Sequence, residues 1–134
     1  MATARGSGPR LRVRINPHAW AQEVERYAQG SQARVAGERE RPRLERDGLA
    51  VRQLLPCEEV GLEGARLGGL VKAYVPISDD PPSRRLFGFV LAPRPDPDGP
   101  YLALVAFGER HPEPGTRSVY ERAHKRLHGR YPDQ

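Results

Sequence analysis

Basic side chains dominate the groups in this sequence that could take part in chemistry. The 134 residues contain 22 Lys and Arg against 17 Asp and Glu, which gives a net charge of +5, and the isoelectric point is near 9.9. A basic balance favours an anionic partner such as nucleic acid. However, lysine occurs only at Lys72 and Lys125, whereas arginine, alanine, glycine and proline are abundant. A compositional preference for arginine therefore explains the charge equally well.

Three short patterns are similar to a metal site, a phosphate-binding loop and a catalytic cysteine, but none of them supports that function. His124 and His128 have the i, i+4 spacing of a metal-binding pair, but they lack the adjacent glutamate and a third ligand, so no metal site is expected. The glycine-rich stretch 64–69 lacks the Lys-Ser/Thr pair of a phosphate-binding loop. Cys57, the single cysteine, is expected to be a small buried side chain rather than a nucleophile.

The expected cellular location follows from what the sequence lacks. One cysteine cannot form a disulfide within the chain, which fits a reducing cytoplasm. No run approaches the roughly 18 apolar residues of a membrane-spanning helix. Residues 1–14 hold four arginines and no acid, and they lack the apolar core of a secretory signal. We therefore expect a cytoplasmic protein with no membrane partner. The chain length favours a single domain, which we expect over residues 11–130 after a flexible tail over residues 1–10.

In the first half of the chain, hydrophobic spacing and capping signals predict a strand and two helices. Residues 11–15 alternate apolar and basic side chains, which is the period of a half-buried strand. Asn16 and Pro17 are well placed to begin a helix over residues 18–29, whose apolar side chains recur every three or four residues. Ser31 can cap a second helix over about 32–40.

The region after the second helix gives weaker signals. Gly37 and Pro42 make the limits of that helix uncertain, and the charged run 39–47 is expected to be a solvated face. Residues 49–57 contain strand-like stretches, and residues 58–69 are rich in turns.

The second half of the chain predicts three successive strands and a helix. The strands are expected at residues 70–77, 84–91 and 101–107, and turn-rich segments join them. The third strand is apolar throughout, which is typical of a central strand. A helix over residues 117–128 should end at Gly129.

This order of elements predicts an α+β fold. Strands that follow one another through turns form an antiparallel meander. We therefore expect a small antiparallel sheet of about four strands packed against two N-terminal helices, with a C-terminal helix and all helices on one face.

The segment 104–128 resembles the C-terminal part of RelE-type toxins, which belong to the RelE/ParE superfamily. A buried strand ends in Gly108-Glu109-Arg110, and a Val-Tyr-x-x-Ala-x-x-Arg pattern follows at residues 119–126. Upstream, the turn at 67–69, the strand with Lys72 and the strand with Arg85 are similar to family elements, so the resemblance covers about residues 67–128. The connection 111–117 is longer than in the family.

The resemblance implies the toxin of a toxin–antitoxin system, acting as a metal-independent, ribosome-associated mRNA endonuclease without a cofactor. In such toxins the ribose 2′-hydroxyl attacks the adjacent phosphate. The reaction needs a base for the hydroxyl proton, cations for the charge on the phosphorane and an acid for the leaving 5′-oxygen. The implied partners are mRNA, the ribosome and a cognate antitoxin protein.

The catalytic residues that the resemblance implies are carried over position by position. Arg110 would bind the scissile phosphate through its guanidinium, and Arg85 would stabilise the transition state. Tyr120 would stack on or orient a base. Lys72 is the candidate proton acceptor, a role that it can fill only when it is uncharged.

The identity of the base stays open because the second lysine of the family's basic strand is Tyr74 here. His111 is the alternative, since histidine exchanges protons near neutral pH. Additional contacts to RNA are expected from four residues, Arg84, Tyr74, Arg117 and Lys125.

Two other functions fit the same expected fold. ParE-type relatives inhibit DNA gyrase, but they usually lack such clustered basic residues. A non-catalytic module that binds RNA or protein is the second alternative, favoured by the long 111–117 connection and by the missing second lysine.

Overall fold

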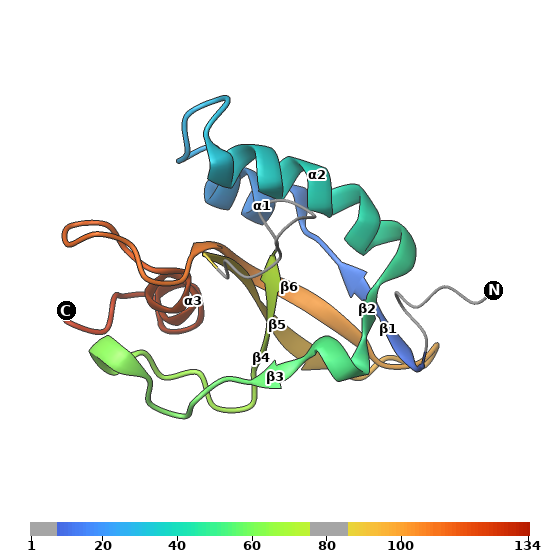
Figure 1. Ribbon diagram of the computed structural model, residues 1–134. Coiled ribbons are helices and arrows are strands. Elements are labelled where there is room, and N and C mark those ends of the chain that lie inside the picture. The colour runs from blue at the N-terminus through green and yellow to red at the C-terminus, as the bar shows by residue number, and fades with distance from the viewer. Residues whose placement is uncertain (1–7, 76–85) are drawn as a thin grey trace.

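The computed structural model describes residues 8–75 and 86–134, which form one mixed sheet with three helices packed around it (Figure 1). Six strands make up the sheet, in the order β2-β1-β6-β5-β4-β3. In chain order they are β1 (Arg10–Arg14), β2 (Leu49–Ala50), β3 (Leu55–Pro56), β4 (Val71–Val75), β5 (Phe87–Arg94) and β6 (Tyr101–Glu109).

The sheet confirms the expected meander but is larger than the expected four strands. β4, β5 and β6 pair antiparallel in succession, and β6 is central because it lies between β5 and β1. β1 pairs with β6 in parallel, so the sheet is mixed rather than antiparallel. β2 and β3 add a two-residue strand at each edge; both lie within the strand-like segment 49–57, which the expected four-stranded sheet did not include.

Helices cover both faces of the sheet, and the expectation that all of them lie on one face is wrong. Successive residues of a strand point to opposite faces. Accordingly, Phe89 and Leu91 of β5 belong to a core with α1 (Pro17–Val24) and α2 (Gln32–Asp47), whereas Val90 and Ala92 belong to a second core with α3 (Val119–His128). The second core also includes part of the segment that precedes β4.

Helix α2 continues through Pro42 to Asp47, seven residues beyond the expected end near residue 40. Pro42 is exposed, and the turn that follows it buries Leu44 in the first core. The proline removes one backbone hydrogen bond, and burial of this leucine offsets part of that loss. Gly37 also has a packing role, because a Cβ there would lie 2.9 Å from the ring of Phe107.

Helix α1 covers the part of β6 that β1 leaves unpaired. The last paired residue of β1 is Arg14, so the backbone of β6 beyond residue 103 has an open edge on this side. Three side chains bind this edge. The Phe107 N–H donates to Glu23 at 3.3 Å, Arg26 donates to the Phe107 carbonyl at 3.0 Å, and the Glu109 N–H donates to the Tyr27 hydroxyl at 3.0 Å.

This edge contact also explains why α1 is shorter than expected. Asn16 caps the helix by accepting hydrogen bonds from two backbone N–H groups, as the sequence predicted. The helix then ends at Val24 instead of continuing to residue 29. Arg26 and Tyr27 lie beyond its end, where their side chains reach β6.

Candidate functional site

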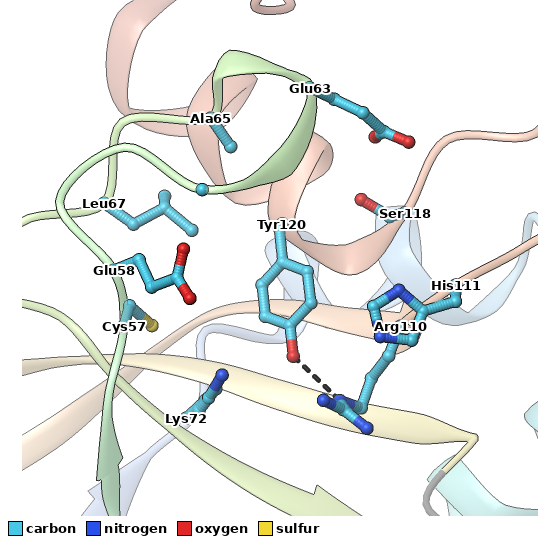
Figure 2. A pocket seen from close by; sticks show the side chains of 11 residues that line it. Cys57, Glu58, Glu63, Ala65, Leu67, Lys72, Arg110, His111, Ser118 and Tyr120 are labelled. Carbon is cyan, nitrogen blue, oxygen red and sulfur yellow. Dashed lines mark hydrogen bonds between the residues drawn. The ribbon is translucent and has the colours of Figure 1, made fainter.

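A pocket of about 250 Å³ lies on the α3 face of the sheet, where the end of β6 meets the start of α3 (Figure 2). Two groups of side chains line most of it. The basic wall consists of Lys72, Arg110, His111 and Tyr120. The loop wall is formed by residues 57–67, with Cys57, Glu58, Glu63, Ala65 and Leu67 among its side chains.

Arg110 is held across the sheet by two tyrosines. Its Nε donates to the Tyr120 hydroxyl at 2.8 Å and its Nη2 donates to the Tyr74 hydroxyl at 3.3 Å. The guanidinium also lies 4.1 Å from the centre of the Tyr74 ring. Because Gly88 has no side chain between β4 and β6, Arg110 can cross β5 at this point; a Cβ there would lie 3.4 Å from the Arg110 Cγ.

The first turn of α3 fixes Tyr120 beside Arg110. Ser118 accepts a hydrogen bond from the Glu121 N–H at 3.1 Å, and Glu121 accepts one from the Ser118 N–H at 3.0 Å. This reciprocal capping defines where the helix begins. Tyr120 is therefore positioned by the helix start, while its ring packs against the second core.

Lys72 and His111 flank Tyr120. The Lys72 ammonium lies 5.4 Å from the centre of the Tyr120 ring, which is within the range of a cation–π contact. The half-buried Lys72 makes no ion pair with any residue of the described ranges 8–75 and 86–134. The exposed His111 ring is centred 6.5 Å from that of Tyr120. Two groups that can exchange protons thus lie close to one tyrosine.

The loop wall combines an apolar surface with carboxylates. Burial raises the pKa of the Cys57 thiol to about 11, although the nearby Lys72 lowers it somewhat. The thiol therefore stays protonated at neutral pH, which supports the expectation that it is not a nucleophile. The side chain is partly buried rather than fully buried as expected. Beside it, Ala65 and Leu67 are buried, while Glu58 is exposed and points into the pocket (Figure 2).

Glu63 forms a carboxyl–carboxyl contact with Glu121. A hydrogen bond with Glu121 raises the pKa of Glu63, and burial and charge repulsion act in the same direction. Burial alone would raise the pKa of Glu121, but hydrogen bonds from the Ser118 N–H and from Arg117 lower it overall. Glu63 also has a left-handed backbone, with φ of 65°, which is unusual for a residue with a side chain. The pair thus joins the loop wall to the start of α3.

Two histidines of α3 hold the same loop from behind the pocket. The Arg66 N–H donates to Nδ1 of His124 at 3.0 Å, and Nε2 of His128 lies 3.2 Å from the Arg66 carbonyl. His124 is only 6% exposed. Burial lowers its pKa, and the charges of His128, Arg130 and Arg66 lower it further. An unprotonated Nδ1 is required to accept the Arg66 hydrogen bond.

The structure brings together five of the residues that the sequence singled out. Lys72, Arg110, His111 and Tyr120 line the pocket, and Tyr74 binds Arg110 from the sheet side. The candidates Arg84 and Arg85 lie outside the described residues.

Two expected RNA contacts lie elsewhere in the structure. Arg117 donates to Glu121 and to Asp133, both at 2.9 Å, and its guanidinium stacks on Tyr131. Lys125 is exposed on α3, also over the Tyr131 ring. Neither residue lines the pocket with Lys72 and Arg110.

Sequence reasoning missed both carboxylates of the loop wall. Glu58 and Glu63 belong to a turn-rich segment without hydrophobic periodicity, so no spacing rule indicated where their side chains would point. Only the glycines around them, which predict turns, marked this segment as one that could fold over a site.

Compared with known proteins, the chain matches no family model, no curated protein and no solved structure at a significant level. Family membership is therefore not shown.

Within residues 8–75 and 86–134, no three His, Cys, Asp or Glu side chains come together in a way that could hold a metal ion. In the same ranges, no helix combines the length and the apolar character needed to cross a bilayer.

Proposed function

We propose that this protein is an RNA-cleaving toxin of the RelE type, and that the pocket beside Arg110 and Tyr120 binds the scissile phosphate. The observation that carries the proposal is the arrangement of Arg110, which two tyrosines hold in a fixed position next to Lys72 and His111. A guanidinium held in this way can stabilise charge that develops in a transition state without first reorganising.

The order of elements adds support to the proposal. A strand, two helices, three successive strands and a helix follow one another, apart from the two short edge strands. This is the order that the resemblance to RelE-type toxins implies. Three of the residues that the resemblance implies as catalytic, Lys72, Arg110 and Tyr120, also line the pocket.

In the proposed reaction, the ribose 2′-oxygen forms a bond to phosphorus and the bond from phosphorus to the 5′-oxygen breaks. The products are a 2′,3′-cyclic phosphate and a free 5′-hydroxyl. The 2′-hydroxyl proton passes to a base of the protein, and the leaving oxygen receives a proton from an acid, so no water or oxidant is consumed. Arg110 binds the phosphate oxygens, which carry the developing negative charge.

Lys72 and His111 are the two groups of the basic wall that can exchange these protons. Attacking and leaving oxygens lie on opposite sides of the phosphorus in such a displacement. Lys72 and His111 lie on different sides of Tyr120 (Figure 2), which suits a base and an acid that act from two directions. We assign Lys72 as the proton acceptor and His111 as the donor to the leaving oxygen.

The proposal is tested by inducing the wild-type protein and its variants in bacteria while growth and mRNA 5′-ends are followed. The wild type should arrest growth and produce new cuts within translated codons. Arg110→Ala and His111→Ala should restore growth, whereas Arg94→Ala, which changes an exposed arginine outside the pocket, should remain toxic. Circular dichroism of each purified variant checks that it is folded.

The outcomes separate the proposed function from its alternatives. If the wild type leaves mRNA intact but stops purified gyrase, the ParE-type alternative replaces this proposal. If it is harmless and binds RNA with a steep salt dependence, the pocket belongs to a binding module. If Arg110→Ala is as toxic as the wild type, the pocket is not the site of cleavage.

A further inference from the structure

The two ends of the pocket carry opposite charge. Arg110 supplies positive charge on the basic wall, while Glu58 supplies a carboxylate on the loop wall. Figure 2 shows the Glu58 carboxylate directed into the space beside Leu67 and Tyr120. In the described ranges 8–75 and 86–134, Glu58 makes no ion pair with any residue, so no described side chain neutralises its charge.

Between these charges lies a surface suited to a flat apolar ring. Leu67 and Ala65 contribute aliphatic groups, the neutral Cys57 thiol lies beside them, and the ring of Tyr120 borders the same space. Aromatic side chains of this kind stack on nucleobases. The volume of about 250 Å³ is below that of pockets for drug-sized ligands, so it suits a single nucleoside rather than a longer segment.

We propose that the pocket selects the base upstream of the scissile phosphate, and that Glu58 makes it prefer guanine. This inference rests on the proposed function, because the phosphate must bind at Arg110 for the base to reach the loop wall. With the phosphate on the basic wall, the base lies between Leu67 and Tyr120, and its Watson–Crick edge faces the Glu58 carboxylate.

The preference for guanine follows from hydrogen-bond chemistry. A carboxylate only accepts hydrogen bonds, and its two oxygens fit two donors that lie side by side. Guanine offers two adjacent donors on its Watson–Crick edge, the ring N1–H and the exocyclic amino group. Adenine and cytosine offer one amino group next to an unprotonated ring nitrogen. Uracil offers one N–H between two carbonyl oxygens, which a carboxylate repels.

Glu63 does not share this role. Its carboxyl group is engaged with Glu121, and Figure 2 shows it directed toward Ser118 rather than toward Tyr120. Its contact with α3 keeps the loop wall in place. Glu58 is therefore a specificity residue, and Glu63 is a positioning residue for the loop that carries Glu58.

The test measures binding of single nucleotides to the purified protein by calorimetric titration, with guanosine 3′-monophosphate and uridine 3′-monophosphate as probes. The wild type should bind the guanosine compound at least tenfold more tightly, because a bidentate contact of this kind discriminates by about that factor or more. Glu58→Gln should remove most of this preference while leaving binding of the uridine compound unchanged or stronger. Glu59→Gln is the matched control, since Glu59 is the exposed neighbour of Glu58 and does not line the pocket.

Each outcome decides between the inference and the proposed function. Equal binding of the two nucleotides by the wild type would overturn the guanine preference and leave the phosphate site intact. The same holds if Glu58→Gln weakens both nucleotides alike. If neither nucleotide binds and inorganic phosphate fails as well, the proposed function fails together with the inference.

Discussion

Replacing Glu23 by alanine should be among the most destabilising single changes in this protein. Glu23 is only 1% exposed. It accepts hydrogen bonds from the Phe107 N–H, from Arg122 at 2.6 Å and from Arg126 at 2.8 Å. One carboxylate thus connects α1, β6 and α3, the elements that also position Arg110 and Tyr120. Removing it leaves the Phe107 N–H without its acceptor and takes the ion-pair partner from two arginines, which keep only their hydrogen bonds to Gln22 and Tyr131.

The size of this loss in stability depends on how well water can hydrate the groups that lose Glu23 as their partner. Breaking a buried ion pair by removing one partner costs about 3–5 kcal/mol. The side chains of Arg122 and Arg126 are 20% and 27% exposed, so water can hydrate them in part. We therefore expect the lower end of the range, about 3 kcal/mol in the free energy of unfolding. For a domain of this size that corresponds to a fall of roughly 10 °C in Tm.

Urea denaturation followed by fluorescence measures this loss directly, because Trp20 is the single tryptophan and is buried in the first core. Glu25→Ala is the matched control two residues further along the chain, since Glu25 is exposed and should change stability by less than about 0.5 kcal/mol. Glu23→Gln keeps an acceptor for Phe107 and should lie between the two. A loss below about 1 kcal/mol for Glu23→Ala would refute the reasoning that this carboxylate connects the three elements.

Three further predictions concern the surroundings of the pocket. Gly88→Val should weaken nucleotide binding in the calorimetric titration about as much as Arg110→Ala, because its side chain would occupy the space that Arg110 crosses; unchanged binding would contradict this account. The lowered pKa of His124 means that the unfolded chain takes up a proton, near the usual pKa of about 6.5, that the folded protein resists. The contribution of His124 to the free energy of unfolding should therefore be fully present above that pH and decline as the pH falls below it. Urea unfolding at pH 5 and pH 7.5 measures this decline, and the His124→Asn variant should show a smaller difference between the two pH values than the wild type. Cys57, whose pKa is about 11, should react with a thiol reagent at pH 8 roughly a hundredfold more slowly in the folded protein than in urea; equal rates would show that the thiol is not protected.

The fold was most predictable where local signals and packing agree. The apolar run of β6 and the caps of α1 and α3 were visible in the sequence, because Asn16 and Gly129 mark helix ends by their own backbone chemistry. The end of α2 was not visible, since Pro42 opposes a helix locally and only the burial of Leu44 overrides it. Which face α3 covers was equally hidden, because the spacing within one helix does not specify its partner.

The candidate site was likewise predictable only in part. Lys72, Arg110, His111 and Tyr120 were identified from sequence, and the structure places them around one pocket. The acidic side of that pocket depends on how the segment 57–67 folds back over the sheet, which is decided by contacts distant in sequence. The bond between Arg66 and His124, 58 residues apart, is an example.

The parallel pairing of β1 with β6 has a consequence for the way this chain acquires its structure. Arg12 pairs with Tyr101, so the partner of the first strand lies in the last quarter of the chain. Contacts of such long sequence separation form late and slow the folding of a domain. A growing chain on the ribosome therefore cannot complete the sheet until residue 109 has emerged, and Arg110 and Tyr120 follow only after that. The pocket can therefore form only after residues through Tyr120 have emerged.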